Sequence, residues 1–264
     1  MNPTTEPGRR RRLGILLICS MSLLIVGLDI TAMNVALPTI GNELDADLSW
    51  LQWTVSAYTV VMASFLMLAG SMADRFGRKR VLITGMSVFA LASGLCATAP
   101  TVEWLVAFRV LQGLGASMLN PVAMSIITNT FTEPRERAQA IGVWGAVFGV
   151  AMALGPVVGG TFVSTIGWTW IFLMNIPLGL TAIGLMMRFV PESRAPAPRR
   201  FDPVGQTLVV ALLGSLTFGV IEGPAAGWTS APILVAFGMS TVSLVGLLTY
   251  EPRREQPLID LRFF

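Results

Sequence analysis

Residues 70–80 read Gly70-Ser-Met-Ala-Asp74-Arg75-Phe-Gly77-Arg78-Lys79-Arg80, a charged segment between two long apolar stretches. The apolar stretches on either side cover about residues 51–73 and 81–99. A helix that crosses the hydrocarbon core of a bilayer needs about 20 mostly apolar residues, and both stretches are long enough. The segment therefore predicts a short polar connection between two membrane-spanning helices.

The same pattern of apolar stretch and short polar connection runs through the whole chain. Hydrophobic residues make up 53% of the sequence, charged residues 12%, and the mean hydropathy is +0.69. A soluble chain carries about 25% charged residues, so this composition excludes a soluble protein. We expect an all-α membrane protein with eight spans, at about residues 13–38, 51–73, 81–99, 104–128, 139–163, 169–189, 204–222 and 231–250.

The basic residues predict the orientation of these spans. With the N-terminus inside, 17 of the 18 Lys and Arg residues fall in cytoplasmic segments, and the remaining one is Arg109. The outer connections hold acidic residues: Glu43, Asp45, Asp47 and Glu103. This asymmetry follows the positive-inside rule, and an even number of spans places both termini in the cytoplasm.

The chain is expected to divide into five parts. Residues 1–12 form a basic cytoplasmic N-terminus, and residues 13–189 form a six-helix bundle. Residues 190–203, rich in Pro and Arg, read as a cytoplasmic linker before two further spans at 204–250. Residues 251–264 are expected to begin a cytoplasmic loop that is cut short.

The segment at 70–80 also fits G-x-x-x-D-R-x-G-R-[KR], and here the chain resembles the major facilitator superfamily. Glycine permits a tight turn, and an aspartate among arginines forms charge-assisted pairs. The resemblance implies a cytoplasmic gating loop with Gly70, Asp74, Arg75, Gly77, Arg78 and Lys79. The competing interpretation is an ordinary basic connection.

Asp29 and Arg109 are the ionisable residues deepest within the apolar stretches. Charges at membrane depth cost several kcal/mol unless they are paired or hydrated, so both are functional candidates. A carboxylate in a low-dielectric cavity can exchange a proton or pair with a cationic substrate. Arg109, Gly113, Ala116 and Asn120 share one helical face that can line a cavity. A purely structural role for either charge is the alternative.

The surroundings of these two residues carry further resemblances. Arg109 to Ser117 resembles the R-x-x-Q-G-x-G-x-[AS] motif of the superfamily, whose arginine is linked with proton coupling. The stretch Leu28 to Pro38 resembles the first helix of its fourteen-helix drug–proton antiporters, the EmrB/QacA branch. The residues expected at a site for proton coupling and substrate are Asp29, Arg109, Asn34, Gln112 and Asn120.

Small residues also gather in the span at 139–163. Gly155-Pro156-Val-Val-Gly159-Gly160 resembles the G-P-x-x-G-G core of the superfamily's antiporter motif, with Ala151 where a glycine is usual. Glycines four apart let two helices approach closely, and proline bends a helix. Close packing alone would also favour these glycines.

The same branch is suggested by two later segments. Trp168 to Gly179 is similar to W-R-W-x-F-x-I-N-x-P-x-G, with Thr169 in place of the arginine, and residues 201–205 also match. The family fold has two six-helix bundles around a central cavity, here with two extra helices between them. The resemblance therefore implies that this chain supplies the first bundle and the two linking helices, a truncated N-terminal portion.

The function expected from this resemblance is proton-coupled export of amphipathic, cationic small molecules across the cell membrane, contributing to multidrug and antibiotic resistance. Export of a metabolite or amino acid, or a fragment that does not transport, remain alternatives. The chain has no histidine and no phosphate-binding loop, so we expect no enzyme activity, no metal and no cofactor besides the proton gradient. The expected partners are the substrate, the bilayer and a missing second half or second copy, with no nucleic acid.

Overall fold

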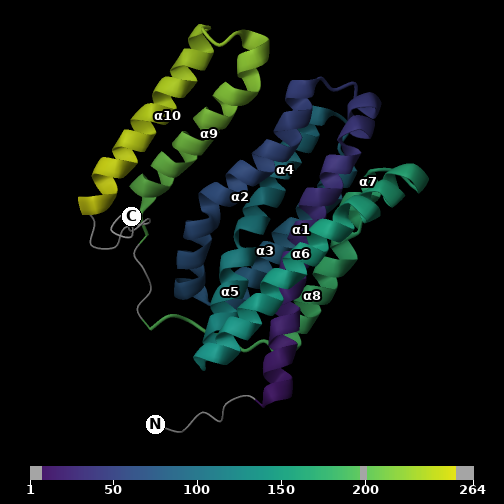
Figure 1. Cartoon of the computed structure of the whole chain (residues 1–264), viewed down its shortest axis with the longest axis vertical. Coiled ribbons are helices and arrows are strands. Elements are labelled where there is room, and N and C mark those ends of the chain that lie inside the picture. The colour runs from purple at the N-terminus through teal and green to yellow at the C-terminus, as the bar shows by residue number, and fades with distance from the viewer. Residues whose placement is uncertain (1–7, 197–200, 254–264) are drawn as a thin grey trace.

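The computed structural model describes residues 8–196 and 201–253. The predictions for residues 1–7, for Arg199 and Arg200, and for most of residues 251–264 concern residues outside this range. Within it the chain forms α1 (Arg9–Glu43), α2 (Leu48–Phe76), α3 (Arg78–Ala97), α4 (Val102–Ser117), α5 (Leu119–Thr130), α6 (Pro134–Thr165), α7 (Thr169–Leu173), α8 (Asn175–Phe189), α9 (Pro203–Ala226), α10 (Ala231–Tyr250) and the short η1 (Glu251–Arg253) (Figure 1).

These elements make eight helices long and apolar enough to cross a membrane, which confirms the expected number of spans. Two spans are interrupted: α4 and α5 together cover Val102–Thr130, and α7 and α8 cover Thr169–Phe189. Proline explains both interruptions, because it has no N–H to donate to the carbonyl four residues earlier. Pro121 removes the usual donor to the Ser117 carbonyl, and α4 ends at Ser117; Pro177 removes the usual donor to the Leu173 carbonyl, where α7 ends.

The connection between α2 and α3 is shorter than expected. α2 continues to Phe76 and α3 begins at Arg78, so Gly77 alone lies between them, with φ at +114°. Glycine adopts this conformation without the steric cost that a side chain would add. Gly70 was expected in the gating loop but lies inside α2, where an added Cβ would meet nothing within 4 Å.

The most extensive helix packing joins α1 to α6, which run side by side in Figure 1. A Cβ added to Gly155 would fall on the Thr31 side chain, and one added to Gly159 would lie 2.8 Å from the Ala32 carbonyl oxygen. On α1, a Cβ at Gly27 would lie 2.7 Å from Cβ of Ala151. Small residues on both helices therefore let the two backbones approach within van der Waals contact.

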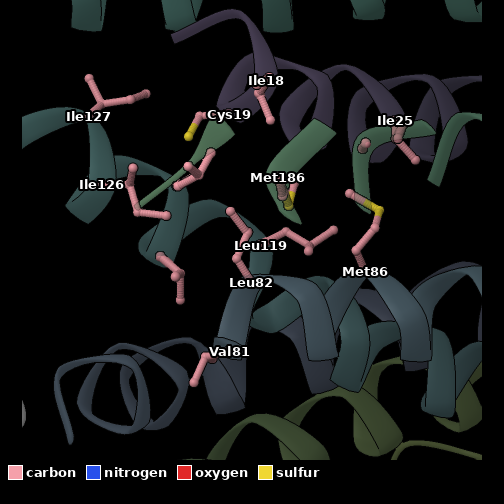
Figure 2. Packing of buried hydrophobic residues seen from close by; sticks show 14 of the residues in the cluster. Ile18, Cys19, Ile25, Val81, Leu82, Met86, Leu119, Ile126, Ile127 and Met186 are labelled. Atoms are coloured by element: carbon pink, nitrogen blue, oxygen red, sulfur yellow. The ribbon is translucent and has the colours of Figure 1, made fainter. Parts of the chain in front are cut away.

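Two apolar clusters fill the bundle, one toward each end. Figure 2 shows the first, where side chains from α1, α3, α5 and α8 meet; it includes Ile18, Cys19, Leu82, Leu119 and Met186. The second lies toward the acidic end of the helices and includes Ile40, Leu105 and Phe172. Cys19 and Cys96 are both buried and free, in agreement with the positions of both residues in separate apolar stretches.

The hairpin of α9 and α10 packs beside α2 (Figure 1). Glu222 of α9 accepts hydrogen bonds from Ser49 Oγ at 2.8 Å and from Trp53 Nε1 at 2.7 Å. Near the other end of α9, Gln206 Nε2 donates to the Ser64 carbonyl at 2.8 Å. Polar contacts at both ends of α9 thus hold the hairpin against the bundle, while much of its remaining surface is apolar and exposed, as lipid contact requires.

The close approach of α1 and α6 leads to a prediction. Gly159→Ala forces a methyl group against the backbone of Ala32, which cannot rotate away, and overpacking of this kind costs about 1–3 kcal/mol. We expect a lower thermal unfolding temperature in detergent micelles. Gly149→Ala is the matched control on the same helix, since its Cβ meets nothing within 4 Å. Equal melting temperatures for the two variants would contradict the packing described here.

Candidate functional site

The two buried charges found in the sequence meet in the middle of the bundle. Arg109 of α4 donates from Nη1 to Asp29 Oδ2 of α1 at 2.6 Å. Asp29 is 0% exposed and Arg109 is 1% exposed. The pair carries no net charge, which makes burial in an apolar interior tolerable; neither charge would be stable there alone.

The second oxygen of Asp29 is held by two amides from other helices. Gln112 Nε2 and Asn175 Nδ2 each donate to Asp29 Oδ1 at 2.9 Å. Both amides also donate to Ser93 Oγ of α3, at 2.8 and 3.3 Å. The carboxylate is therefore surrounded by donors from α4 and α8, and Ser93 joins the two amides into one network.

Arg109 has further partners that fix its position. Its Nε donates to the Thr54 carbonyl of α2 at 3.0 Å, and Nη1 also donates to Gln112 Oε1 at 2.7 Å. The guanidinium lies over the Tyr58 ring at 4.1 Å from its centroid, within the range of a cation–π interaction. Five of the spans thus contribute to this cluster around Asp29 and Arg109, which we call the central polar cluster.

Four members of the central polar cluster were not among the expected site residues: Thr54, which contributes its carbonyl, Tyr58, Ser93 and Asn175. Asn175 lies within the motif at Trp168 to Gly179. A single amide side chain in an apolar stretch could have indicated a buried polar contact there. Ser93 gave no comparable signal, because serine is common in membrane helices, where its hydroxyl bonds to its own helix, here to the Phe89 carbonyl.

Two expectations about this region are wrong. Asp29 was expected in a low-dielectric cavity and Arg109 on a helical face that lines one, but both side chains are fully enclosed, since their opposite charges pair between helices. The face carrying Gly113 and Ala116 does not line a cavity either. A Cβ on Gly113 would lie 2.7 Å from the Tyr58 carbonyl oxygen, so the glycine serves the close packing of α4 on α2.

Asn34 and Asn120 lie apart from the central polar cluster. Asn120 is partly buried in α5, and its Oδ1 has no hydrogen-bond partner among the described residues. Asn34 is exposed and lines a pocket of about 430 Å³ between α1 and α2, which we call the outer pocket. The lining of the outer pocket is uncharged: Asn34, Leu37, Pro38, Leu48, Leu51, Gln52, Val55 and Ser56.

The outer pocket and the central polar cluster share the same two helices. Asn34 follows Asp29 by five positions on α1, a rise of about 7.5 Å. On α2, the carbonyl that Arg109 contacts belongs to Thr54, directly before the pocket residues Val55 and Ser56. A movement of Arg109 would therefore act on the backbone next to the pocket.

The expected gating loop is held by a segment that follows α8. Arg78 Nη2 pairs with Asp74 at 3.0 Å, and the Arg78 amide donates to the Ser193 carbonyl at 2.9 Å. Glu192 accepts from the Lys79 amide at 3.1 Å, and its carboxylate lies where a side chain on Gly77 would be. Glu192 was not among the expected site residues because it lies in the predicted linker; an acid among arginines was the available signal.

The remaining expected residues surround these contacts. Arg75 lies at the end of α2 with its guanidinium 5.9 Å from the Phe76 ring centroid. Gly155 and Gly159 contact α1 at Thr31 and Ala32, whereas Gly160 is in ordinary contact and Pro156 is exposed. Thr31 follows Asp29 by two positions, so the glycine contact with α6 borders the central polar cluster.

The sequence matches the Major Facilitator Superfamily over residues 19–257. It is 40% identical over 237 residues to the methylenomycin A resistance protein of Streptomyces coelicolor, an alignment that covers 90% of this chain and 50% of that protein. It is 36% identical over 255 residues to the multidrug resistance protein Stp of Mycobacterium tuberculosis, covering 97% and 48%. The chain thus spans about half the length of the curated relatives it matches.

The fold also occurs in a solved structure. A crystal structure of a peptide transporter POT in complex with sulfate superposes with a TM-score of 0.65, over 93% of this chain and 53% of that chain. The two sequences are 15% identical, so the likeness concerns the fold alone.

The ion pair in the central polar cluster leads to a prediction about stability. Arg109→Met removes one partner and leaves a buried carboxylate without compensation, which costs about 3–5 kcal/mol. Replacing Asp29 as well, in Asp29→Asn with Arg109→Met, removes the uncompensated charge. We expect the double variant to unfold at a higher temperature than Arg109→Met alone. A double variant no more stable than the single one would show that the pair is not the reason for the loss.

Proposed function

Because the chain belongs to the Major Facilitator Superfamily, we propose that it forms the proton-coupling half of a transporter that exports amphipathic small molecules. The chain is a multi-pass membrane protein, as a transporter of this kind must be. The names of two relatives, one a methylenomycin A resistance protein and one a multidrug resistance protein, support drug efflux. The observation that carries the proton-coupling part of the proposal is the enclosed Asp29–Arg109 pair.

Protonation of Asp29 would destabilise the closed cluster. The neutral carboxyl would leave Arg109 as a buried cation without a counter-charge, and such a cation is costly in an apolar interior. Proton binding is therefore favoured in a conformation where Arg109 has moved away from Asp29 and reached water or another acceptor. By linkage, the proton and that conformation stabilise each other, which is the requirement for coupling a proton to a change of access.

Asn175 supports the same mechanism. A protonated Asp29 must donate its O–H to an acceptor, and Asn175 Oδ1 is a buried acceptor with no hydrogen-bond partner among the described residues. If the Asn175 amide turned by half a rotation, Oδ1 would take the place of Nδ2 beside Asp29. We propose that Asn175 donates to the ionised carboxylate and accepts from the protonated one.

The outer pocket supports an amphipathic substrate. Its volume of about 430 Å³ lies within the range of drug-sized sites, about 300–1,000 Å³, and its apolar lining carries Asn34, Gln52 and Ser56 as hydrogen-bonding groups. A positive charge on the substrate would reach Asp29 only after Arg109 has moved. We propose that the substrate and the proton thereby compete for one carboxylate.

We further propose that the chain belongs to the fourteen-helix branch and that transport requires a second bundle. Alternating access needs one bundle to move against another, and this chain corresponds to about half of its relatives. Further sequence or a second copy of the chain could supply the second bundle. The span pair α9 and α10, pinned to α2 through Glu222, would then be the link between bundles.

Asp29→Asn tests the proposed coupling. The substitution keeps the size of the side chain but removes the ionisable group, so we expect efflux driven by an imposed pH gradient to fall at least tenfold in membrane vesicles. Each variant is made in the full-length protein. Uptake of a fluorescent amphipathic dye into inverted vesicles provides the measurement.

The control is Asp45→Asn, which removes an exposed carboxylate from the connection after α1 and should leave efflux unchanged. Asparagine tolerates the positive φ of 49° at this position. Full pH-driven efflux by Asp29→Asn, with expression equal to that of Asp45→Asn, would refute the proposed role of Asp29.

A further inference from the structure

A second pocket lies at the basic end of the bundle, between α1 and α6, at the end predicted to face the cytoplasm. Its volume is about 170 Å³. Nine residues line it: Arg9, Arg12, Leu13, Leu16, Phe131, Glu136, Gln139, Ala140 and Val143. None of these residues belongs to the central polar cluster, the outer pocket or the expected gating loop, and we call this site the basic pocket.

The basic pocket is made by one face of each helix. On α1, Arg9, Arg12, Leu13 and Leu16 follow the spacing of a single helical face. Arg10 and Arg11, equally basic and next in sequence, are exposed and do not line the pocket. Of the four arginines at the start of α1, Arg9 and Arg12 therefore line the pocket, and the other two do not.

Arg12 can donate to a second anionic group in addition to Glu136. It pairs with Glu136 at 2.5 Å, and its guanidinium lies 5.9 Å from the Phe131 ring centroid. Its Nε is buried and has no hydrogen-bond partner within the described residues. With Arg9 beside it, the pocket holds two positive charges against the single negative charge of Glu136.

The wall of the basic pocket becomes apolar toward the membrane interior. Leu13 lies one turn beyond Arg9 on α1, Val143 lies two turns beyond Glu136 on α6, and they are 45% and 46% exposed. The pocket thus holds cationic donors near the basic end of the bundle, with exposed aliphatic side chains next to them on the side of the apolar spans. A free inorganic anion would contact the cationic donors but would not need the exposed aliphatic side chains.

From this arrangement we propose that the basic pocket binds the phosphate of an anionic phospholipid in the cytoplasmic leaflet. Arg9 and Arg12 contact the phosphate, and Leu13 and Val143 contact the start of the acyl chains. Basic pockets between spans on the cytoplasmic side are suited to such headgroups, and each positive charge near the surface strengthens the attraction. Glu136 competes with the phosphate for Arg12.

The test measures lipid binding to the detergent-purified chain by native mass spectrometry, with phosphatidylglycerol and phosphatidylcholine as probes. We expect selective retention of phosphatidylglycerol. Arg9→Gln should weaken that retention about fivefold, since one phosphate contact is lost. Arg10→Gln is the matched control, with the same change in net charge outside the pocket, and should retain the lipid as the unmodified protein does. Glu136→Gln should strengthen retention, because it frees Arg12.

Three outcomes would overturn the proposal. Equal retention of the two lipids would exclude an anionic-lipid site, and equal loss in Arg9→Gln and Arg10→Gln would indicate general surface attraction. Displacement of phosphatidylglycerol by millimolar inorganic phosphate would assign the pocket to a free anion. Arg9 is chosen for substitution because it is exposed, so the variant is expected to fold.

Discussion

The ion pair between Asp29 and Arg109 is the constraint on which the rest of the bundle depends. Two charges in an apolar interior must lie close together and be hydrogen-bonded, because either one alone is too costly to bury. Meeting this requirement brings α1 and α4 together at one depth and recruits donors from α8 and the carbonyl of Thr54 on α2. The pair therefore sets the register of several spans at once.

The segment of α1 around Asp29 takes part in three different contacts. Thr31 and Ala32 meet the glycines of α6, where the absence of side chains allows close approach. Asp29 meets the polar side chains of α4 and α8, and Asn34 opens onto the outer pocket. A shift of α1 that separated Asp29 from Arg109 would thus also change the glycine contact and the pocket. This arrangement favours two discrete states over a gradual deformation.

At the basic end of the molecule, too, one short segment makes several contacts. Gly77 makes the turn between α2 and α3 short enough for Glu192 to reach the first amides of α3. The segment after α8 is thereby tied to the connection expected to gate the cytoplasmic side. Arg9 and Arg12 at the start of α1 lie outside this contact and form the basic pocket with α6, so the proposed lipid contacts are separate from the expected gating contacts.

The sequence by itself determined the membrane class, the eight spans, and the identity of the two charges that must find partners. It could do so because hydrophobic length and isolated charges act locally along the chain. The motif residues around Arg109 also predicted the family, which the comparisons confirmed. Element ends were less accurate: α2 continues to Phe76 through charged residues, because a helix can extend into the polar interface.

Only the tertiary structure decided which groups enclose Asp29. Ser93 and Asn175 lie far from it in sequence, and no local pattern distinguishes a serine that joins a network from one that bonds only to its own helix. The tertiary structure likewise placed Asn34 in a separate pocket and enclosed Asp29 and Arg109, which had been expected at a cavity. Contacts between side chains of different spans depend on helix rotation and depth, and these quantities follow from the packing of all the helices together.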